Sequence, residues 1–348
     1  MRCVRTSLLP AEWTESDRRG WETANAKGQF LRADGRAANW KHKTRRGVEK
    51  RYGLWLGYLK SAGALVDCQR PSERATRQNL EGYVGHLQDR GNASTTIVSC
   101  IRDVREAIRV MEPDADLSLL SELLATLSAR QSPTRHKQAQ IMHPDDLLSG
   151  VLAFLDAVPG GTFYNERSRA GKYRDGLIVA LFAARPIRLA NMTEMTIGQQ
   201  LIEDNGHWLC RFAAHEMKDD RPLAFSIPGV LVPYLETYLS LYRPRLLNGN
   251  DHCRLWISSR GRPMSEQSIY WNTSRLTEEL FGRRINPHLF RDCAASAIAS
   301  DDPEHVLASA RILGHASLNT TERYYNQSQM TAAIDAYHAI LADIQAGG

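Results

Sequence analysis

The sequence lacks a hydrophobic run long enough to cross a bilayer. Its longest apolar stretch, residues 177–184, is far shorter than the about 20 residues that a transmembrane helix requires. Near the beginning, Arg2 and Arg5 are followed only by the short apolar segment 7–9, which does not make a convincing secretory signal. We therefore expect no membrane association and a cytoplasmic protein.

Cysteine is scarce, and its placement excludes two common frameworks. None of the six cysteines forms a CxxC pair, so neither a zinc site nor a disulfide-stabilised domain is indicated. The cysteines are Cys3, Cys68, Cys100, Cys210, Cys253 and Cys293. We expect them to be reduced thiols in a reducing compartment.

Internal repeats and low-complexity segments are also lacking. The 348 residues are enough for about two domains, each with a core of its own. Apolar residues make up 43% of the chain and charged residues 24%, which is typical of globular proteins. The formal net charge of +5 permits binding to nucleic acid but is weak support for it.

Residues 1–47 are polar and basic, with tryptophans interleaved among the charges. Two interpretations stand side by side. One is a flexible or partly helical lead-in with a solvated charge run; the other is an arm that neutralises DNA phosphates. The candidate DNA-binding residues of this segment are Lys41, Lys43, Arg45 and Arg46.

Residues 48–128 carry apolar side chains at helical spacing in four successive segments, two of them ended by Gly63 and Gly91. Such stripes are typical of core faces, so we predict a small helical bundle with a basic, DNA-binding surface. A polar, basic linker, residues 129–142, follows the bundle. The candidate DNA-binding residues of bundle and linker are Arg74, Arg77, Arg102, Arg105, Arg135 and Lys137.

A second domain is predicted over residues 143–348. Three short segments at 197–202, 208–212 and 223–227 are typical of strands, the first two joined at Asn205-Gly206. Helices are predicted at residues 144–158, 167–184, 230–242, 265–281, 287–300, 303–312, 320–326 and 329–344. The predicted fold class is therefore mainly α with a small antiparallel β-sheet (α+β).

The residues that carry chemistry gather in one stretch near the C-terminal end. His288 and Arg291 are three apart and so share a helix face, with Asn286 as the natural N-cap. His315 follows a Leu-Gly turn, and Tyr324 lies nine residues further on. Two imidazoles, a guanidinium and a phenol, without a carboxylate pair or a cysteine ligand, suit a phosphate and a tyrosine nucleophile better than a metal. No metal and no cofactor are expected.

The segment PHLFR, the later LGH and the tyrosine nine residues after that histidine resemble the tyrosine recombinase (phage integrase) family. The resemblance covers residues 144–344, the family's catalytic domain, and the preceding bundle resembles its core-binding domain. It implies a site-specific recombinase or integrase that cleaves and rejoins DNA without a metal, through a 3′-phosphotyrosyl intermediate and a Holliday junction.

Three alternatives stay open beside this interpretation. A type IB topoisomerase-like enzyme would share the chemistry, and a catalytically inactive DNA-binding regulator would share the fold. A metal hydrolase using His288 and His315 is disfavoured, because no carboxylate or cysteine ligands stand nearby at standard spacing.

The resemblance implies roles for four residues of the C-terminal stretch. Tyr324 matches the nucleophile; Tyr325 competes with it, and the nine-residue offset from His315 favours Tyr324. Arg291 matches the second catalytic arginine, whose planar fork fits the non-bridging phosphate oxygens. His288 matches a general acid–base or phosphate donor, and His315 matches a donor to the phosphate.

Two further catalytic residues are implied upstream. The first catalytic arginine matches Arg188, with Arg185 as its competitor. Asn191 then stands where an acidic residue is common, which leaves open how Arg188 is supported. Lys218, in the turn before the third predicted strand, matches the general acid that protonates the leaving 5′-oxygen.

Two smaller departures from the family pattern surround Arg291. Asp292 stands where a histidine is frequent; it either orients His288 or His315 or is a plain acid on the helix surface, and we favour the second interpretation. The segment between Arg291 and His315 is one residue longer than in typical relatives.

The resemblance also implies partners. Double-stranded DNA with recombination sites is the expected substrate, held by a homo-tetramer whose subunits are monomers or dimers in free solution. Accessory DNA-bending or directionality proteins, a mobile-element origin and a nucleoid-associated location are further expectations. Residues 329–344 carry an apolar stripe at helical spacing, which predicts either docking on a neighbouring protomer or burial on the chain's own domain.

Overall fold

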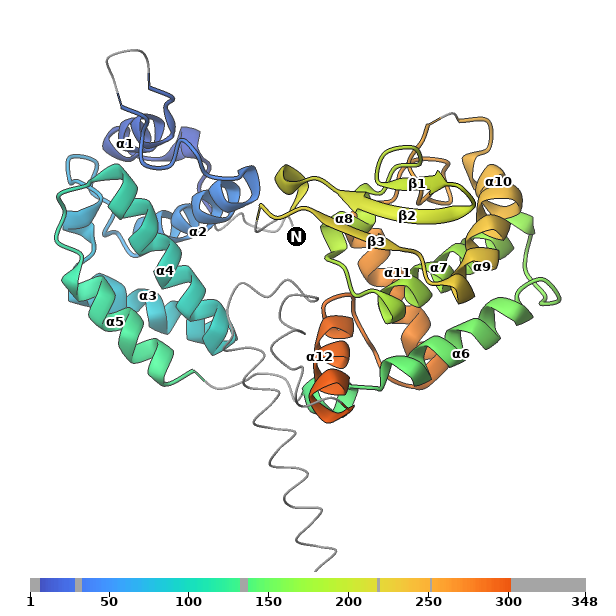
Figure 1. Ribbon diagram of the computed structural model, residues 1–348. Coiled ribbons are helices and arrows are strands. Elements are labelled where there is room, and N and C mark those ends of the chain that lie inside the picture. Colours follow the sequence, from blue (N-terminus) through green and yellow to red (C-terminus); the bar gives the residue numbers. More distant parts are fainter. Residues whose placement is uncertain (1–6, 29–32, 132–136, 218–219, 251, 302–348) are drawn as a thin grey trace, which may run out of the picture. The chain divides into compact units, whose positions relative to one another are not determined.

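The computed structural model describes residues 7–301, except 29–32, 132–136, 218–219 and 251. The chain divides into two compact units, Met1–His136 and Lys137–Gly348, and the division falls within the predicted linker. Each unit has a hydrophobic core of its own. The described residues are mostly helical with a small antiparallel sheet, so the predicted fold class is confirmed (Figure 1).

The first unit is a helical bundle. Its described α-helices are α1 (Glu15–Asn25), α2 (His42–Ser61), α3 (Arg77–Asp89), α4 (Ser94–Met111) and α5 (Ser118–Ala129). Helix α4 contacts the other four, and its stripe of Ile101, Val104 and Ile108 is completely buried. Gly63 and Gly91 adopt positive φ angles of 67° and 70° directly after α2 and α3, where helices commonly end on glycine.

The described part of residues 1–47 is not a lead-in separate from the helical bundle, as one of the two interpretations had it. Trp13 and Trp21 expose only 4% and 3% of their surface and lie in the core of the first unit. The Trp13 ring meets Trp21 and Tyr52 edge to face, at centroid distances of 5.8 and 5.1 Å. Burial of each large apolar side chain contributes about 1.5–3 kcal/mol, which ties the described part of this segment into the bundle.

The second unit is built around α7. Its described α-helices are α6 (Pro144–Ala157), α7 (Glu166–Ala184), α8 (Leu189–Glu194), α9 (Val232–Thr237), α10 (Arg243–Leu247), α11 (Glu266–Phe281) and α12 (Leu289–Asp301). Residues 177–182 of α7 are all at most 3% exposed, because α6, α10, α11 and α12 pack against this helix. A helix covered on several sides has a continuous apolar run rather than a stripe.

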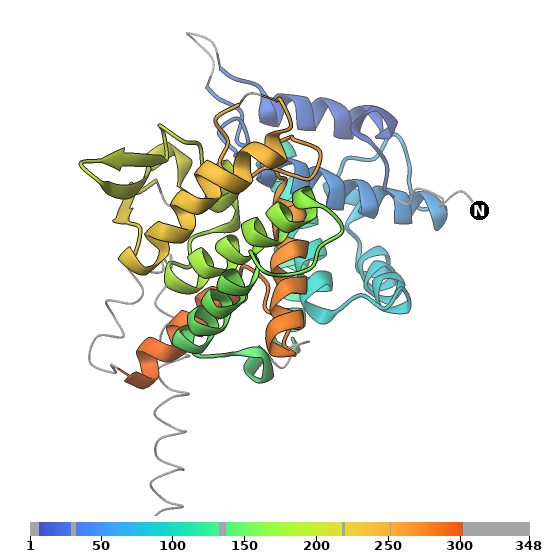
Figure 2. The same ribbon diagram turned by 90° about the vertical axis from the view of Figure 1, so that its right-hand side faces the viewer.

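Two features of the helices complete the second unit. Helix α9, the π-helical turn η6 (Tyr238–Tyr242) and α10 follow one another without a break, and Figure 2 shows them as one gold helix. Among the described residues, no helix is both long and apolar enough to cross a membrane.

The sheet consists of β1 (Leu201–Asp204), β2 (His207–Phe212) and β3 (Leu223–Ser226) in that order, all antiparallel. Asn205 and Gly206 connect β1 to β2 with φ angles of 50° and 79°, as the predicted two-residue hairpin turn requires. Cys210 pairs with Leu201 on one side and Phe225 on the other. The first strand begins at Leu201 rather than at the predicted residue 197, because Gly198, at φ 81°, belongs to a turn.

The predicted helices at residues 303–312, 320–326 and 329–344 lie outside the described residues. The predicted helix at 287–300 is present as α12, from Leu289 to Asp301.

Candidate active site

The start of α12 is fixed by a side-chain cap. Asn286 Oδ1 accepts the backbone N–H groups of His288 and Leu289 at 3.0 and 3.2 Å. Just before the cap, the Ile285 N–H donates to the buried Thr277 Oγ1 of α11 at 2.9 Å. The chain therefore enters α12 along a defined path, and His288 is exposed at that entrance.

Arg291 lies one turn further along α12 and is only 7% exposed. Its Nη1 donates to the carbonyl oxygen of Pro186 at 2.9 Å. The neighbouring Phe290 ring stacks on Phe182 of α7 at a centroid distance of 5.6 Å, which fixes the rotation of α12 about its axis. The guanidinium is therefore anchored to the loop between α7 and α8.

The same loop carries the two candidates for the first catalytic arginine. Arg188 is the N-cap residue of α8 and half-buried, whereas Arg185 caps the C-terminal end of α7 and is exposed. Arg188 lies two residues beyond the carbonyl that Arg291 contacts. The structure thus brings the Arg188 segment and the Arg291 helix together, and the choice between Arg188 and Arg185 stays a prediction.

Asn191, one turn into α8, is 5% exposed and reaches towards the sheet. Its Nδ2 donates to the Glu216 carbonyl oxygen at 3.2 Å and contacts Met217 Sδ at 3.5 Å. These residues close the 3₁₀ turn η4 (Ala214–Glu216) after β2 and lead directly into Lys218. The sequence pattern showed Asn191 only as a missing acid and gave no sign of this contact.

Three of the predicted catalytic residues lie outside the described residues: Lys218, His315 and Tyr324. The remaining three, Arg188, His288 and Arg291, belong to segments that hydrogen bonds join.

The favoured interpretation of Asp292 as a helix-surface acid is wrong. Only 5% of Asp292 is exposed, and the helix that carries it, α12, packs against α6 and α7. The other interpretation, that Asp292 orients His288 or His315, stays a prediction.

The described cysteines, Cys68, Cys100, Cys210, Cys253 and Cys293, are free thiols. Burial raises the pKa of Cys210 to about 12 and that of Cys293 to about 11. Cys293 lies two residues after Arg291 on α12. Because its pKa is raised, the Cys293 thiol is protonated at neutral pH and unsuited to act as a nucleophile.

Most of the described residues that are predicted to bind DNA in the bundle and its lead-in are accessible. Lys41, Lys43, Arg45 and Arg46 are exposed at the beginning of α2, and Arg77 and Arg102 are exposed on α3 and α4. Arg105 is half-buried and donates to Ser121 Oγ at 3.2 Å. Lys137 begins the 3₁₀ turn η3 (Lys137–Gln140), whereas Arg135 lies outside the described residues.

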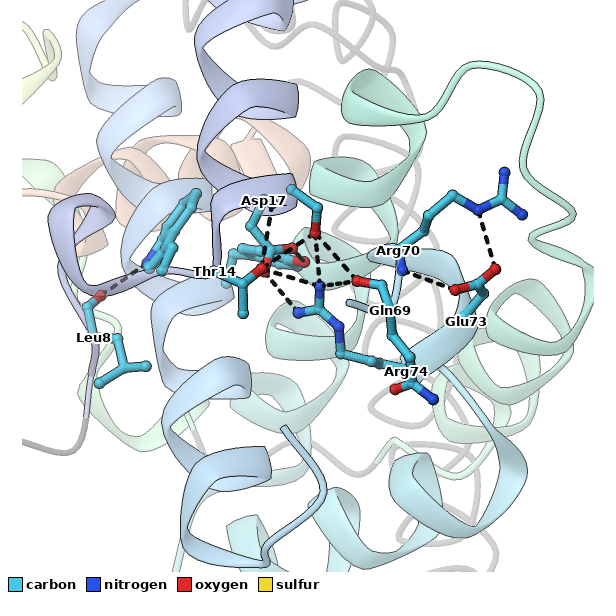
Figure 3. Close-up of polar contacts among 10 residues, drawn as sticks. Leu8, Thr14, Asp17, Gln69, Arg70, Glu73 and Arg74 are labelled. Carbon is cyan, nitrogen blue, oxygen red and sulfur yellow. Dashed lines mark hydrogen bonds and ion pairs between the residues drawn. The ribbon is translucent and has the colours of Figure 1, made fainter. Parts of the chain in front are cut away.

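Arg74 is the exception, and its prediction as a DNA-binding residue is wrong. The side chains of Arg74 and Asp17 are completely buried, with Nη1 and Oδ2 2.6 Å apart. Nη2 of Arg74 donates to the Gln69 carbonyl at 2.7 Å, while Thr14 and Tyr52 donate their hydroxyls to the Asp17 carboxylate at 2.5 and 2.6 Å (Figure 3). This buried cluster holds α1 on α2 and leaves Arg74 no access to a phosphate.

Comparison with known sequences gives a consistent set of relatives. The phage integrase family model matches residues 162–331, a span that includes all the predicted catalytic positions. Tyrosine recombinase XerD of Staphylococcus aureus strain Mu50 is 24% identical over 271 residues, which cover 75% of this chain and 82% of that protein. XerD of Halalkalibacterium halodurans is 22% identical over 260 residues, which cover 73% and 78%.

Comparison with solved structures shows a shared fold. The XerH site-specific recombinase in its post-cleavage complex with palindromic difH substrate has a TM-score of 0.56 at 15% identity, covering 86% of this chain and 81% of that one. The Tn1549 transposon integrase in complex with transposon right-end DNA has a TM-score of 0.51 at 12% identity, covering 87% and 96%.

Proposed function

This chain belongs to the tyrosine recombinase (phage integrase) family of site-specific DNA recombinases, and on that premise we propose that it cleaves and rejoins DNA through a 3′-phosphotyrosyl intermediate. The observation that carries the proposal is the hydrogen bond from Arg291 Nη1 to the Pro186 carbonyl. It ties α12, which begins directly after His288, to the loop that ends at Arg188. The guanidinium groups of Arg188 and Arg291 and the imidazole of His288 can thereby bind the same phosphate, although they come from separate segments.

In the proposed reaction, the Tyr324 hydroxyl gives its proton to the general acid–base His288, and the phenolate oxygen attacks a backbone phosphorus. A bond forms between phosphorus and the phenolic oxygen, the bond to the 5′-oxygen breaks, and Lys218 supplies the proton that this oxygen needs to leave as a hydroxyl. A 5′-hydroxyl of the partner duplex then attacks the phosphotyrosine and releases the tyrosine. One phosphodiester is exchanged for another, so no external energy source is required.

The remaining residues act on the phosphate during both steps. Arg188 and Arg291 stabilise the charge that develops on its non-bridging oxygens. His288 acts as a general acid–base or hydrogen-bond donor, and His315 donates to the phosphate.

We propose double-stranded DNA as the partner of both units. The exposed basic residues at the beginning of α2 and along α3 and α4 supply the charge that neutralises phosphates in the first unit. The solved relatives named above were captured on DNA, as a difH complex and as a transposon-end complex. Assembly as a homo-tetramer, with residues 329–344 docked on a neighbouring protomer, completes the proposal.

The proposal is tested by trapping the covalent intermediate. On a target duplex nicked just beyond the cleavage position, the short 5′-hydroxyl fragment diffuses away, and we expect an adduct that survives SDS and disappears after protease digestion. The adduct should form equally well in excess EDTA, because Arg188, Lys218 and Arg291 supply the positive charge. A strict requirement for a divalent ion would contradict the metal-free reaction, and a duplex lacking the target sequence serves as the control.

Arg188→Ala is expected to slow adduct formation by about 10²–10³-fold, by analogy with the removal of one donor to a developing oxyanion. Arg185→Ala is the matched control, because Arg185 lies in the same loop and is more exposed. Single-turnover cleavage rates at saturating protein separate this loss from weaker binding. A large defect in Arg185→Ala with a mild one in Arg188→Ala would reverse the assignment.

A further inference from the structure

The turn that leads into Lys218 is tied to the sheet by one side chain. Glu216 Oε2 accepts the Ala213 backbone N–H at 2.6 Å, and Oε1 accepts Gln200 Nε2 at 2.5 Å. Gln200 Oε1 in turn accepts the Thr196 backbone N–H at 3.1 Å. The carboxylate of Glu216 therefore closes η4 and ties it to Gln200, the residue directly before β1, while its carbonyl oxygen contacts a different element.

That second element is α8, through Asn191. The amide Nδ2 approaches two atoms, the Glu216 carbonyl oxygen at 3.2 Å and the Met217 thioether sulfur at 3.5 Å. Both are acceptors only, so the amide must present its NH₂ group to them rather than its oxygen. The contact is shielded from solvent on the α8 side, since Asn191 is only 5% exposed.

We propose that Asn191 is a positioning residue that sets the place of Lys218 relative to Arg188, and that this role requires an amide donor. The inference rests on the function proposed above. Arg188 caps the beginning of α8 and Asn191 lies three residues further along the same short helix. One turn of helix thus carries a phosphate-binding arginine and also anchors the turn from which the general acid follows.

An acid in place of Asn191 cannot perform this role at neutral pH. An ionised carboxylate has no hydrogen to donate, and it would face a carbonyl oxygen and a sulfur at hydrogen-bond distance. Leaving the Glu216 carbonyl without this donor and placing a charge there are both unfavourable. The family pattern commonly has an acid at this position, so this chain uses a different support for the same region.

The experiment compares Asn191→Asp with the unaltered chain on two nicked target duplexes. One has the normal bridging 5′-oxygen, and the other has sulfur at that position. A thiolate leaves without taking up a proton, so cleavage of the sulfur duplex does not need the general acid. We expect Asn191→Asp to slow cleavage of the normal duplex by about 10–100-fold, which is part of the rate enhancement that a general acid contributes. The variant should cleave the sulfur duplex at nearly the same rate as the unaltered chain.

Cleavage rates measured over a series of pH values provide a second test, because a purely structural role would not change how the relative rate of the variant depends on pH. The carboxyl introduced by Asn191→Asp can donate to the Glu216 carbonyl when it is protonated but not when it is ionised. The rate of this variant relative to the unaltered chain should therefore rise as pH falls.

Thr193→Val is the matched control for both measurements. Thr193 is 8% exposed on the same helix, and its Oγ1 donates within α8 to the Leu189 carbonyl at 2.8 Å, so it does not reach the turn. This variant should show no sulfur-specific rescue and no altered pH profile.

Equal slowing of Asn191→Asp on both duplexes, or an unchanged rate on the normal duplex, would overturn the inference. Either result leaves the proposed function intact as long as the unaltered chain forms the adduct. Absence of an adduct with the unaltered chain would instead refute the proposed function. Rates are compared only at temperatures well below the thermal midpoint of each variant, so that loss of fold is not mistaken for loss of positioning.

Discussion

Arg74→Ala is expected to destabilise the first unit by about 3–5 kcal/mol, because it removes one partner of a buried ion pair and leaves the other charge uncompensated. Asp17 would keep the hydroxyls of Thr14 and Tyr52 but lose the guanidinium 2.6 Å away. Burial, reinforced by the Asp17 carboxylate, raises the pKa of Tyr52 well above its ordinary value, so Tyr52 remains a neutral hydrogen-bond donor and supplies no positive charge in place of the guanidinium.

The measurement is hydrogen–deuterium exchange of the full chain across a urea series, because peptides report each unit separately. Arg77→Ala is the control. The Arg77 side chain is 67% exposed and 3.8 Å from Glu81, so its removal should change the free energy of unfolding by less than about 1 kcal/mol. Replacing Arg74 and Asp17 together by leucine should recover part of the lost stability, since no unpaired charge remains.

DNA affinity gives a second check on the buried arrangement of Arg74. We expect any binding defect of Arg74→Ala to follow the loss of folded protein, whereas Arg77→Ala should weaken binding without loss of stability. An Arg74→Ala chain that keeps its full stability and loses only DNA affinity would contradict the buried arrangement.

Arg74 also marks the limit of sequence reasoning for this fold. Local patterns predicted the helices well, because apolar spacing and the terminal glycines Gly63 and Gly91 act within a few residues. Nothing local distinguishes Arg74 from Arg77, since the difference is made by Asp17, 57 residues away in the sequence. The described part of residues 1–47 was misjudged for the same reason, because burial of its tryptophans depends on distant partners.

The same distinction between local signals and distant contacts applies to the candidate site. The N-cap at Asn286 and the helix that follows could be predicted because the signals are contiguous. The burial of Asp292 and the contact from Asn191 to Glu216 could not, because both depend on how α12 and α8 pack against other elements. A sequence motif identifies residue types that suit a phosphate. The residues that hold them in place contact them only in the folded chain, so they do not occur at a fixed distance from the motif in the sequence.

Tyr324→Phe is expected to abolish the covalent adduct while leaving DNA binding unchanged. Phenylalanine keeps the ring but lacks the oxygen that must bond to phosphorus, so no phosphotyrosine can form and the loss should be complete rather than partial. The choice of Tyr324 depends on its offset of nine residues from His315, as both positions lie outside the described residues. The measurement is SDS-resistant adduct on the nicked duplex, with a gel shift of the same samples to confirm binding.

Tyr325→Phe is the matched control, because it removes the same atom from the adjacent position. It should still form the adduct, since successive residues of a helix point about 100° apart and only one of the two phenols can meet the phosphate that we propose Arg188 and Arg291 bind. Peptide mapping of the protease-digested adduct locates the modified tyrosine independently of the substitutions. An adduct that persists in Tyr324→Phe and vanishes in Tyr325→Phe would move the nucleophile by one residue and would place the attacking oxygen on a different face of the predicted helix at residues 320–326.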